Sequence, residues 1–166
     1  MWLAELTPRP IIEISTESAP TGEVIFAVKE APFRKIVAAP SLSDGTLRFA
    51  ALALATVGST GRRTLVVEEL ENGINPARLT LLIHMIEQAA SADGDVQIIA
   101  STHSPAVLEY ANESTIQAST VIGWDYDEMA SKPVRISSLP HLESALEQRS
   151  LGELQSEGWL QLAAEA

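Results

Sequence analysis

The pattern that most constrains the fold lies between residues 64 and 100, where two short apolar runs flank a helical segment. The runs TLVV and VQIIA are too short for buried helices and are suited to strands. Between them, Asn75 and Pro76 provide the capping side chain and the first-turn proline typical of a helix start. A strand, a helix and a strand joined in this way require a crossover between parallel strands. We therefore expect an α/β fold with a mostly parallel sheet and flanking helices.

The segments outside this unit predict a less regular arrangement. Two runs rich in β-branched residues, separated by the turn sequence APTG, indicate a short antiparallel β section within residues 1–40. Apolar residues at helical spacing then predict a helix that stops near Gly58. The expected elements are strands at residues 11–16 and 23–29, a helix at 47–57, strands at 115–124 and 133–137, and helices from 141 onward.

Composition limits the class of protein. A chain of 166 residues with 46% hydrophobic residues predicts a single domain, residues 1–166, with residues 41–166 carrying its α/β part. The absence of cysteine excludes disulfides and thiolate catalysis. A net charge of -11 disfavours direct phosphate contacts with DNA, so a nucleic-acid role would be indirect. We expect a cytoplasmic protein, because the sequence shows neither a membrane-spanning run nor a signal peptide.

Charged and polar side chains follow the two strands of the crossover unit. Glu68 and Glu69 come directly after the first strand, and His103 follows the second. Because the carboxyl ends of parallel strands share one rim of a sheet, these residues are candidates for one site. Adjacent carboxylates repel each other unless a cation or a proton relieves the repulsion, which favours a divalent metal. The alternative interpretation is a solvated strand end and a loop histidine satisfied by the backbone.

A second candidate site precedes the first long helix, in the sequence SLSDGTLRF. Ser43 is placed to cap this helix, and its first turn leaves backbone N–H groups at the positive end of the helix dipole. A phosphate binds well in such a position, and Gly45 would allow it to approach closely. The alternative interpretation is an ordinary capped helix, since Asp44 would repel an anion unless its side chain turned away.

These motifs occur in a characteristic order: LSDGT, a strand ending in two acids, ENGINP, and a strand ending in STHSP. In this order, over residues 39–110, the chain resembles the C-terminal half of an ABC-type ATPase head, in the AAA-like group that includes the OLD and RecF/SMC-type ATPases. The resemblance implies ATP and Mg²⁺ as cofactors. It also implies dimerisation through ATP and a role in DNA repair or anti-phage defence.

The resemblance also implies a role for each candidate residue. Ser43 and Gly45 match the signature motif, which contacts the γ-phosphate of ATP held by the opposite protomer. Glu68 matches the Walker B acid that helps to hold Mg²⁺, and Glu69 matches the acid that orients or deprotonates the attacking water. His103 matches the switch histidine at the γ-phosphate.

The same family has a segment that crosses the dimer interface, and residues 71–76 match it. This match places Asn75 among the residues that contact the nucleotide. Three positions depart from the usual pattern of these ATPases. Glu68 replaces the more usual aspartate, Leu70 stands where proline is common, and Asn75 stands where histidine is frequent.

One motif of these ATPases is missing. The sequence contains no G-x-x-x-x-G-K-[ST] phosphate loop, and the glycine-rich stretch at residues 58–63 has neither its spacing nor its lysine. The chain therefore looks like half of an ATPase head, which needs a Walker A segment from another chain or segment.

Three functions are open at this stage. The first is an ATPase half-subunit that is active only when complemented. The second is a non-catalytic interaction module, a remnant ATPase fold that binds a partner without turnover. The third, a stand-alone metal hydrolase, has too few candidate ligands.

Overall fold

The computed structural model describes residues 10–32, 34–57, 61–91 and 95–166, and these fall into two compact units. The first unit is residues 1–101 and the second is residues 102–166. The expected helix end at Gly58 lies outside the described residues. The one-domain organisation remains a prediction.

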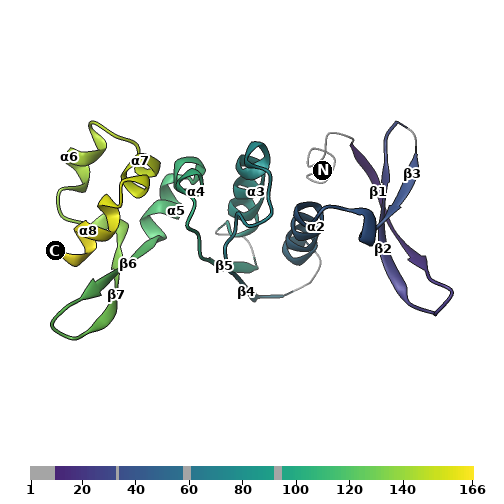
Figure 1. Ribbon diagram of the computed structural model, residues 1–166, viewed down its shortest axis with the longest axis horizontal. Coiled ribbons are helices and arrows are strands. Elements are labelled where there is room, and N and C mark those ends of the chain that lie inside the picture. The colour runs from purple at the N-terminus through teal and green to yellow at the C-terminus, as the bar shows by residue number, and fades with distance from the viewer. Residues whose placement is uncertain (1–9, 33, 58–60, 92–94) are drawn as a thin grey trace. The chain divides into compact units, whose positions relative to one another are not determined.

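The first unit begins with an antiparallel sheet and continues into the crossover unit (Figure 1). Its elements are β1 (Ile11–Ser18), β2 (Val24–Glu30), β3 (Lys35–Ala38), the 3₁₀ turn η1 (Ala39–Ser41), α2 (Asp44–Val57), β4 (Arg63–Val67), α3 (Pro76–Ala89) and β5 (Val96–Ala100).

The antiparallel section at the front of the chain is confirmed. β1 pairs with β2 and β2 pairs with β3, in the order β1-β2-β3. The core of this sheet contains Ile11, Ala27 and Val28, which are almost completely buried. β3 was not expected, because its four residues lie between two prolines that indicated a connector.

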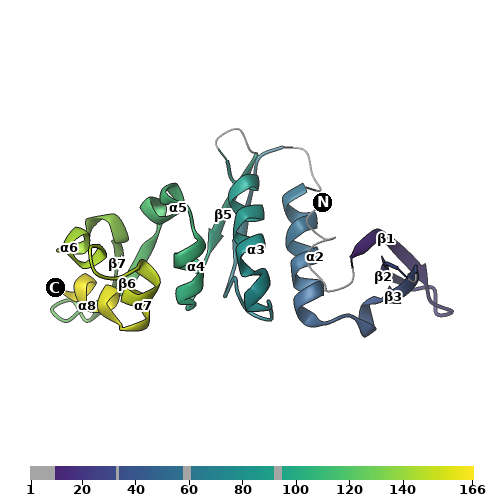
Figure 2. The same ribbon diagram turned by 90° about the horizontal axis from the view of Figure 1, so that it is seen from above.

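The crossover unit also forms as predicted. β4 and β5 pair in parallel, with Leu65 opposite Ile98. Asn75 caps α3 by accepting a hydrogen bond from the Ala77 backbone N–H at 2.9 Å. The apolar face of α3 is buried, and its buried side chains are Leu79, Leu82, Ile83, Met85 and Ile86. Figure 2 shows α2 and α3 lying side by side.

The prediction of a mostly parallel sheet is not met by the described residues. β4 and β5 form a two-stranded sheet of their own, while the other two sheets are antiparallel. Alternate side chains of β4 and β5 also remain open to solvent, with Val66 73% and Ile99 54% exposed. The physical reason is that the residues described by the structure supply two strands of this type, β4 and β5. Apolar strands of a parallel sheet are normally covered on both faces.

The second unit combines a β-hairpin with short helices. Its elements are α4 (Pro105–Tyr110), α5 (Glu113–Ala118), β6 (Thr120–Asp125), β7 (Ala130–Arg135), the 3₁₀ turn η2 (Ile136–Ser138), α6 (Leu142–Leu146), α7 (Leu151–Ser156) and α8 (Trp159–Glu165). Leu154 and Leu160 are fully buried in its core, with Val121, Ile136 and Leu139 around them.

Both expected strands of this unit are corrected, since β7 ends at Arg135 and residues 136–137 of the second belong to η2. In the first, residues 115–118 belong to α5 and residues 120–124 are extended, as part of β6. The reason is local, because the Asn112 side chain accepts a hydrogen bond from the Thr115 backbone N–H at 2.9 Å and starts a helical turn there. The helical C-terminal segment is confirmed.

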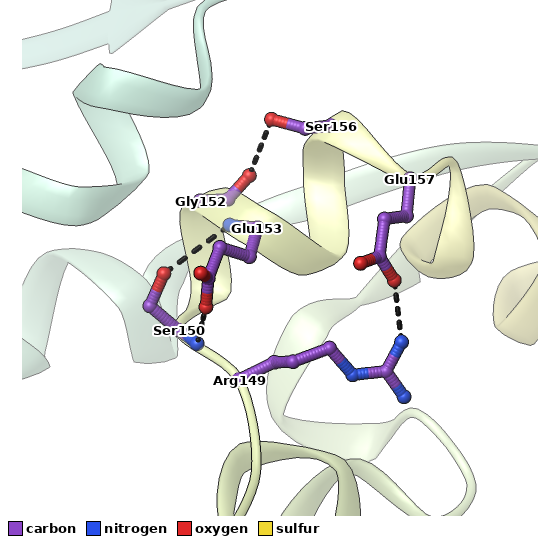
Figure 3. Close-up of polar contacts among 6 residues, drawn as sticks. All are labelled: Arg149, Ser150, Gly152, Glu153, Ser156 and Glu157. Atoms are coloured by element: carbon purple, nitrogen blue, oxygen red, sulfur yellow. Dashed lines mark hydrogen bonds and ion pairs between the residues drawn. The ribbon is translucent and has the colours of Figure 1, made fainter.

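The start of α7 is held by several polar contacts (Figure 3). Ser150 and Glu153 form a reciprocal capping box, with the Glu153 N–H donating to Ser150 Oγ and the Ser150 N–H donating to Glu153 Oε2. Arg149 forms an ion pair with Glu157. Because α7 has only six residues, such contacts at its ends matter more than its helix propensity.

Candidate functional site

The turn that opens α2, residues 43–46, is built as the sequence predicted. We call it the Ser43 turn. Ser43 Oγ accepts from the Thr46 backbone N–H at 3.2 Å and lies 2.8 Å from Thr46 Oγ1. Thr46 is buried, whereas Ser43 and Asp44 are exposed. The cap therefore fixes the first turn of α2 and leaves the start of the helix accessible.

The second part of the site is the acidic turn, residues 68–74, which follows β4. Glu68 and Glu69 are both exposed at the carboxyl end of β4. Glu69 has a left-handed backbone with φ of 47°, which is uncommon for a residue other than glycine. Its backbone N–H donates to Ser101 Oγ at 3.1 Å, and its carbonyl accepts from the Asn72 N–H at 2.8 Å.

The Ser43 turn and the acidic turn lie in direct contact. A Cβ atom added to Gly45 would stand 2.0 Å from the carbonyl oxygen of Gly73. Only a glycine at position 45 allows the two backbones to approach this closely. Beside this contact is a cavity of about 350 Å³, lined by Asp44, Leu47, Arg48, Asn72 and Gly73.

Arg48, on the next turn of α2, adds a second link. Its Nη2 atom donates to the backbone carbonyl of Glu68 and to that of Glu69, the latter at 2.9 Å. Analysis of the sequence did not identify Arg48. One signal was available, since Arg48 is the only basic residue between positions 41 and 61, in a helix that is mostly apolar.

The structure thus brings together, within the first unit, four of the predicted site residues: Ser43, Gly45, Glu68 and Glu69. Asn75 lies just beyond the acidic turn, where its side-chain oxygen caps α3. Asn72 and Ser101 were also missed, although both bond to Glu69. His103 belongs to the second unit, where it is exposed in the segment before α4.

Metal-binding capacity in the described ranges is limited. No group of three or more His, Cys, Asp and Glu side chains there is arranged to hold a metal ion. Glu68 and Glu69 nevertheless suit Mg²⁺, which is usually bound through one or two carboxylates and completed by phosphate oxygens and water. The donor set fits a metal that arrives with a nucleotide, and it does not fit a stand-alone metal hydrolase.

Comparison with protein families gives a match over residues 9–109, which is more than half of the chain. The matching family is described as "AAA domain, putative AbiEii toxin, Type IV TA system". The chain belongs to this family of AAA domains. The match includes all of the acidic turn, the Ser43 turn and His103, so every predicted site residue lies inside the AAA domain region. No curated protein matches the chain.

A solved structure has a similar fold. It comes from work described as "Structural biochemistry of ATP-driven dimerization and DNA stimulated activation of SMC ATPases". The similarity has a TM-score of 0.52 at 17% sequence identity, and it covers 88% of this chain and 83% of the other. The AAA domain therefore has an α/β fold similar to that of an SMC ATPase chain. Among the described residues, every helix is too short or too polar to cross a bilayer.

Proposed function

We propose that this AAA domain supplies half of an ATPase site and is completed by a chain or segment that carries a Walker A phosphate loop. The observation that carries the proposal is the direct contact between the Ser43 turn and the acidic turn within one unit. A helix start suited to phosphate and a carboxylate pair suited to Mg²⁺ then lie on one connected surface.

The exposed apolar side chains of β4 and β5 support the proposal that the chain requires a partner. β4 and β5 are parallel and largely apolar, yet Val66 and Ile99 are 73% and 54% exposed. Parallel strands are stable when both faces are covered. A segment that added strands beside this pair, and packed helices on the sheet, would cover these side chains and would bring its own phosphate loop to the carboxyl ends of the strands.

The proposed chemistry assigns one task to each side chain. Glu68 would hold Mg²⁺, which would supply positive charge at the phosphates of the nucleotide. Glu69 accepts a proton from, or orients, the attacking water. Ser43 and Gly45 contact the γ-phosphate of a nucleotide held mainly by the other polypeptide, with Asn75 beside it. His103 stabilises charge on the transferred phosphoryl group.

Association driven by ATP follows from this division of the site, because each half contacts a different side of the same nucleotide. The solved neighbour is described in terms of ATP-driven dimerisation and DNA-stimulated activation, and the family in terms of a toxin of a type IV toxin–antitoxin system. For this chain we propose a cytoplasmic ATPase that acts in DNA repair or phage defence. With a net charge of -11, this chain would meet DNA through its partner.

The test begins with the partner. The tagged chain is purified from its source cells with Mg-ATP present, and copurifying chains are screened by mass spectrometry for a phosphate loop. Phosphate release is then measured on the purified complex, with and without double-stranded DNA. We expect turnover by the complex and none by the AAA domain alone. A complex that binds its partner tightly but releases no phosphate would establish the interaction-module alternative.

Two substitutions separate chemistry from assembly. Glu69→Gln should lower turnover by about 10²-fold or more, because the amide cannot accept a proton, while ATP-driven association on size-exclusion chromatography persists. Ser43→Arg should abolish that association, because its bulk blocks the γ-phosphate. Glu17→Gln, an exposed acid on β1, is the matched control and should change neither. Full turnover in Glu69→Gln would exclude Glu69 as the catalytic acid.

A further inference from the structure

Arg48 connects α2 to the end of β4 through two hydrogen bonds from one nitrogen. Its Nη2 atom donates to the successive carbonyls of Glu68 and Glu69. Hydrogen bonds from a charged donor are stronger than those between neutral groups. The guanidinium therefore fixes the direction of two consecutive peptide groups at the point where β4 ends.

Those peptide groups need an external restraint. Glu69 has a φ of 47°, and an L-residue adopts this left-handed conformation at a cost that the surroundings must offset. Ser101 accepts from its N–H, while the Asn72 N–H and Arg48 both donate to its carbonyl. Asn72 Nδ2 also donates to the Glu69 carboxylate at 3.1 Å. Glu69 is thus held at its amide, its carbonyl and its side chain.

Arg48 is the restraint on Glu69 that belongs to α2. The helix meets the acidic turn at two points, through Gly45 packed on the Gly73 carbonyl and through Arg48 bonded to Glu68 and Glu69. Because both points lie on adjacent turns of one helix, a shift of the Ser43 turn moves the Arg48 guanidinium with it. The Nε atom of Arg48 is buried and has no hydrogen-bond partner in the described part of the chain, and the hydrogen bonds that orient the guanidinium come from Nη2.

We infer that Arg48 is a positioning residue that holds Glu69 in its left-handed conformation and couples the Ser43 turn to the Glu69 carboxylate. Arg48 contacts neither nucleotide nor water in this scheme and acts only through the backbone of residues 68 and 69. The effect of Arg48 on catalysis rests on the proposed function. Its effect on the backbone conformation of Glu69 does not, and it can be measured on this chain alone without ATP.

The first measurement is amide hydrogen exchange by NMR on the full chain without nucleotide. In Arg48→Met, exchange at the Glu69 and Asn72 amides should rise on the order of tenfold, because a hydrogen bond from a charged group has been lost. The amides of Leu82 and Ile83 in the centre of α3 should be unchanged. Arg62→Met is the matched control, since Arg62 lies at the opposite end of β4 and is exposed.

A conservative variant keeps the inference testable if Arg48→Met fails to fold. Arg48→Lys retains a cation, but its ammonium lies one bond closer to the backbone than Nη2 of arginine and reaches the two carbonyls less well, so its exchange rates should be intermediate. Unchanged exchange at Glu69 and Asn72 in both variants would overturn the inference. An equal increase across α3 and the β1–β2 sheet would do the same, since it would show general destabilisation.

The second measurement uses the complex with the phosphate-loop partner. Arg48→Lys should lower kcat about tenfold or more and leave the KM for ATP and the ATP-driven association unchanged, because Ser43 and the nucleotide contacts remain. A loss of turnover and association together would indicate a merely structural role and would overturn the inference. If the wild-type complex releases no phosphate, the proposed function fails, and the exchange result alone then decides the role of Arg48.

Discussion

The contact between Gly45 and Gly73 leads to a prediction in which two effects oppose each other. Gly45 is the second residue of α2, and its backbone φ is not in the left-handed region. On helix propensity alone, Gly45→Ala would stabilise the chain by up to about 1 kcal/mol. The added Cβ, however, would lie 2.0 Å from the carbonyl oxygen of Gly73. Ordinary van der Waals contact begins at 3.4 Å, so the two segments would have to separate by roughly 1.4 Å.

The steric effect should dominate, because the obstructing atom is backbone and cannot rotate away. Overpacking of this kind costs about 1–3 kcal/mol, and here it also moves Arg48 away from its two carbonyl partners. The loss of the Arg48 hydrogen bonds puts the cost at the upper end of this range, about 3 kcal/mol, so after the propensity gain we expect a net destabilisation of about 2 kcal/mol. With a urea m-value of about 1–3 kcal/mol/M, the unfolding midpoint of the first unit should fall by ~0.7–2 M.

The assay is urea unfolding followed by two-dimensional NMR, so that the first and second units are measured separately. Gly73→Ala is the informative comparison, because a Cβ there would lie 3.7 Å from the Gly45 N and meets no clash. Its φ of 72° should make its cost about 1 kcal/mol, from backbone strain alone. The reasoning is refuted if Gly45→Ala raises the midpoint, or if its effect is smaller than that of Gly73→Ala.

Three further predictions concern other parts of the chain. Gly152→Ala places a Cβ 2.9 Å from the Pro105 carbonyl oxygen and should destabilise the second unit by about 1–3 kcal/mol, measured by thermal unfolding of Trp124 and Trp159 emission. The pKa of the Asp125 carboxyl lies below its ordinary 3.8, chiefly because the Glu128 backbone N–H donates to it. Its contribution to the β6–β7 turn should therefore be complete above pH 3.8 and disappear as the pH falls through the lowered value, and NMR titration should show no such transition in Asp125→Asn. The isolated chain should show no micromolar Mg-ATP site by calorimetry, because it has no phosphate loop.

The elements that were predicted correctly are those in which hydrophobic pattern and capping residues, both read from neighbouring positions, indicate the same structure. β4, α3 and β5 follow from two apolar runs and from Asn75 and Pro76, and the observed cap is the one that the sequence indicates. The pattern at residues 115–118 misled because β-branched residues favour a strand, whereas one Asn112 side chain decided for a helix. A single capping hydrogen bond can outweigh propensity in a segment this short.

The parts of the site that the sequence did not predict depend on contacts between segments far apart in the chain. Arg48 reaches carbonyls twenty and twenty-one residues later, and Ser101 reaches the Glu69 amide across thirty-two residues. Motif order identified Ser43, Gly45, Glu68 and Glu69 because their residue types are characteristic. Arg48 bonds to backbone carbonyls, and a backbone partner leaves no signature in the sequence.

The exposed apolar side chains of β4 and β5 have a consequence for how the protein is maintained in a cell. Under the proposed function, a chain made in excess of its partner would keep the exposed side chains of Val66 and Ile99 in contact with water, and chaperones and proteases recognise surfaces of this kind. We therefore expect the steady-state level of this chain to follow the supply of the proposed partner. Stoichiometric synthesis of the two polypeptides would then determine how much of the proposed complex accumulates.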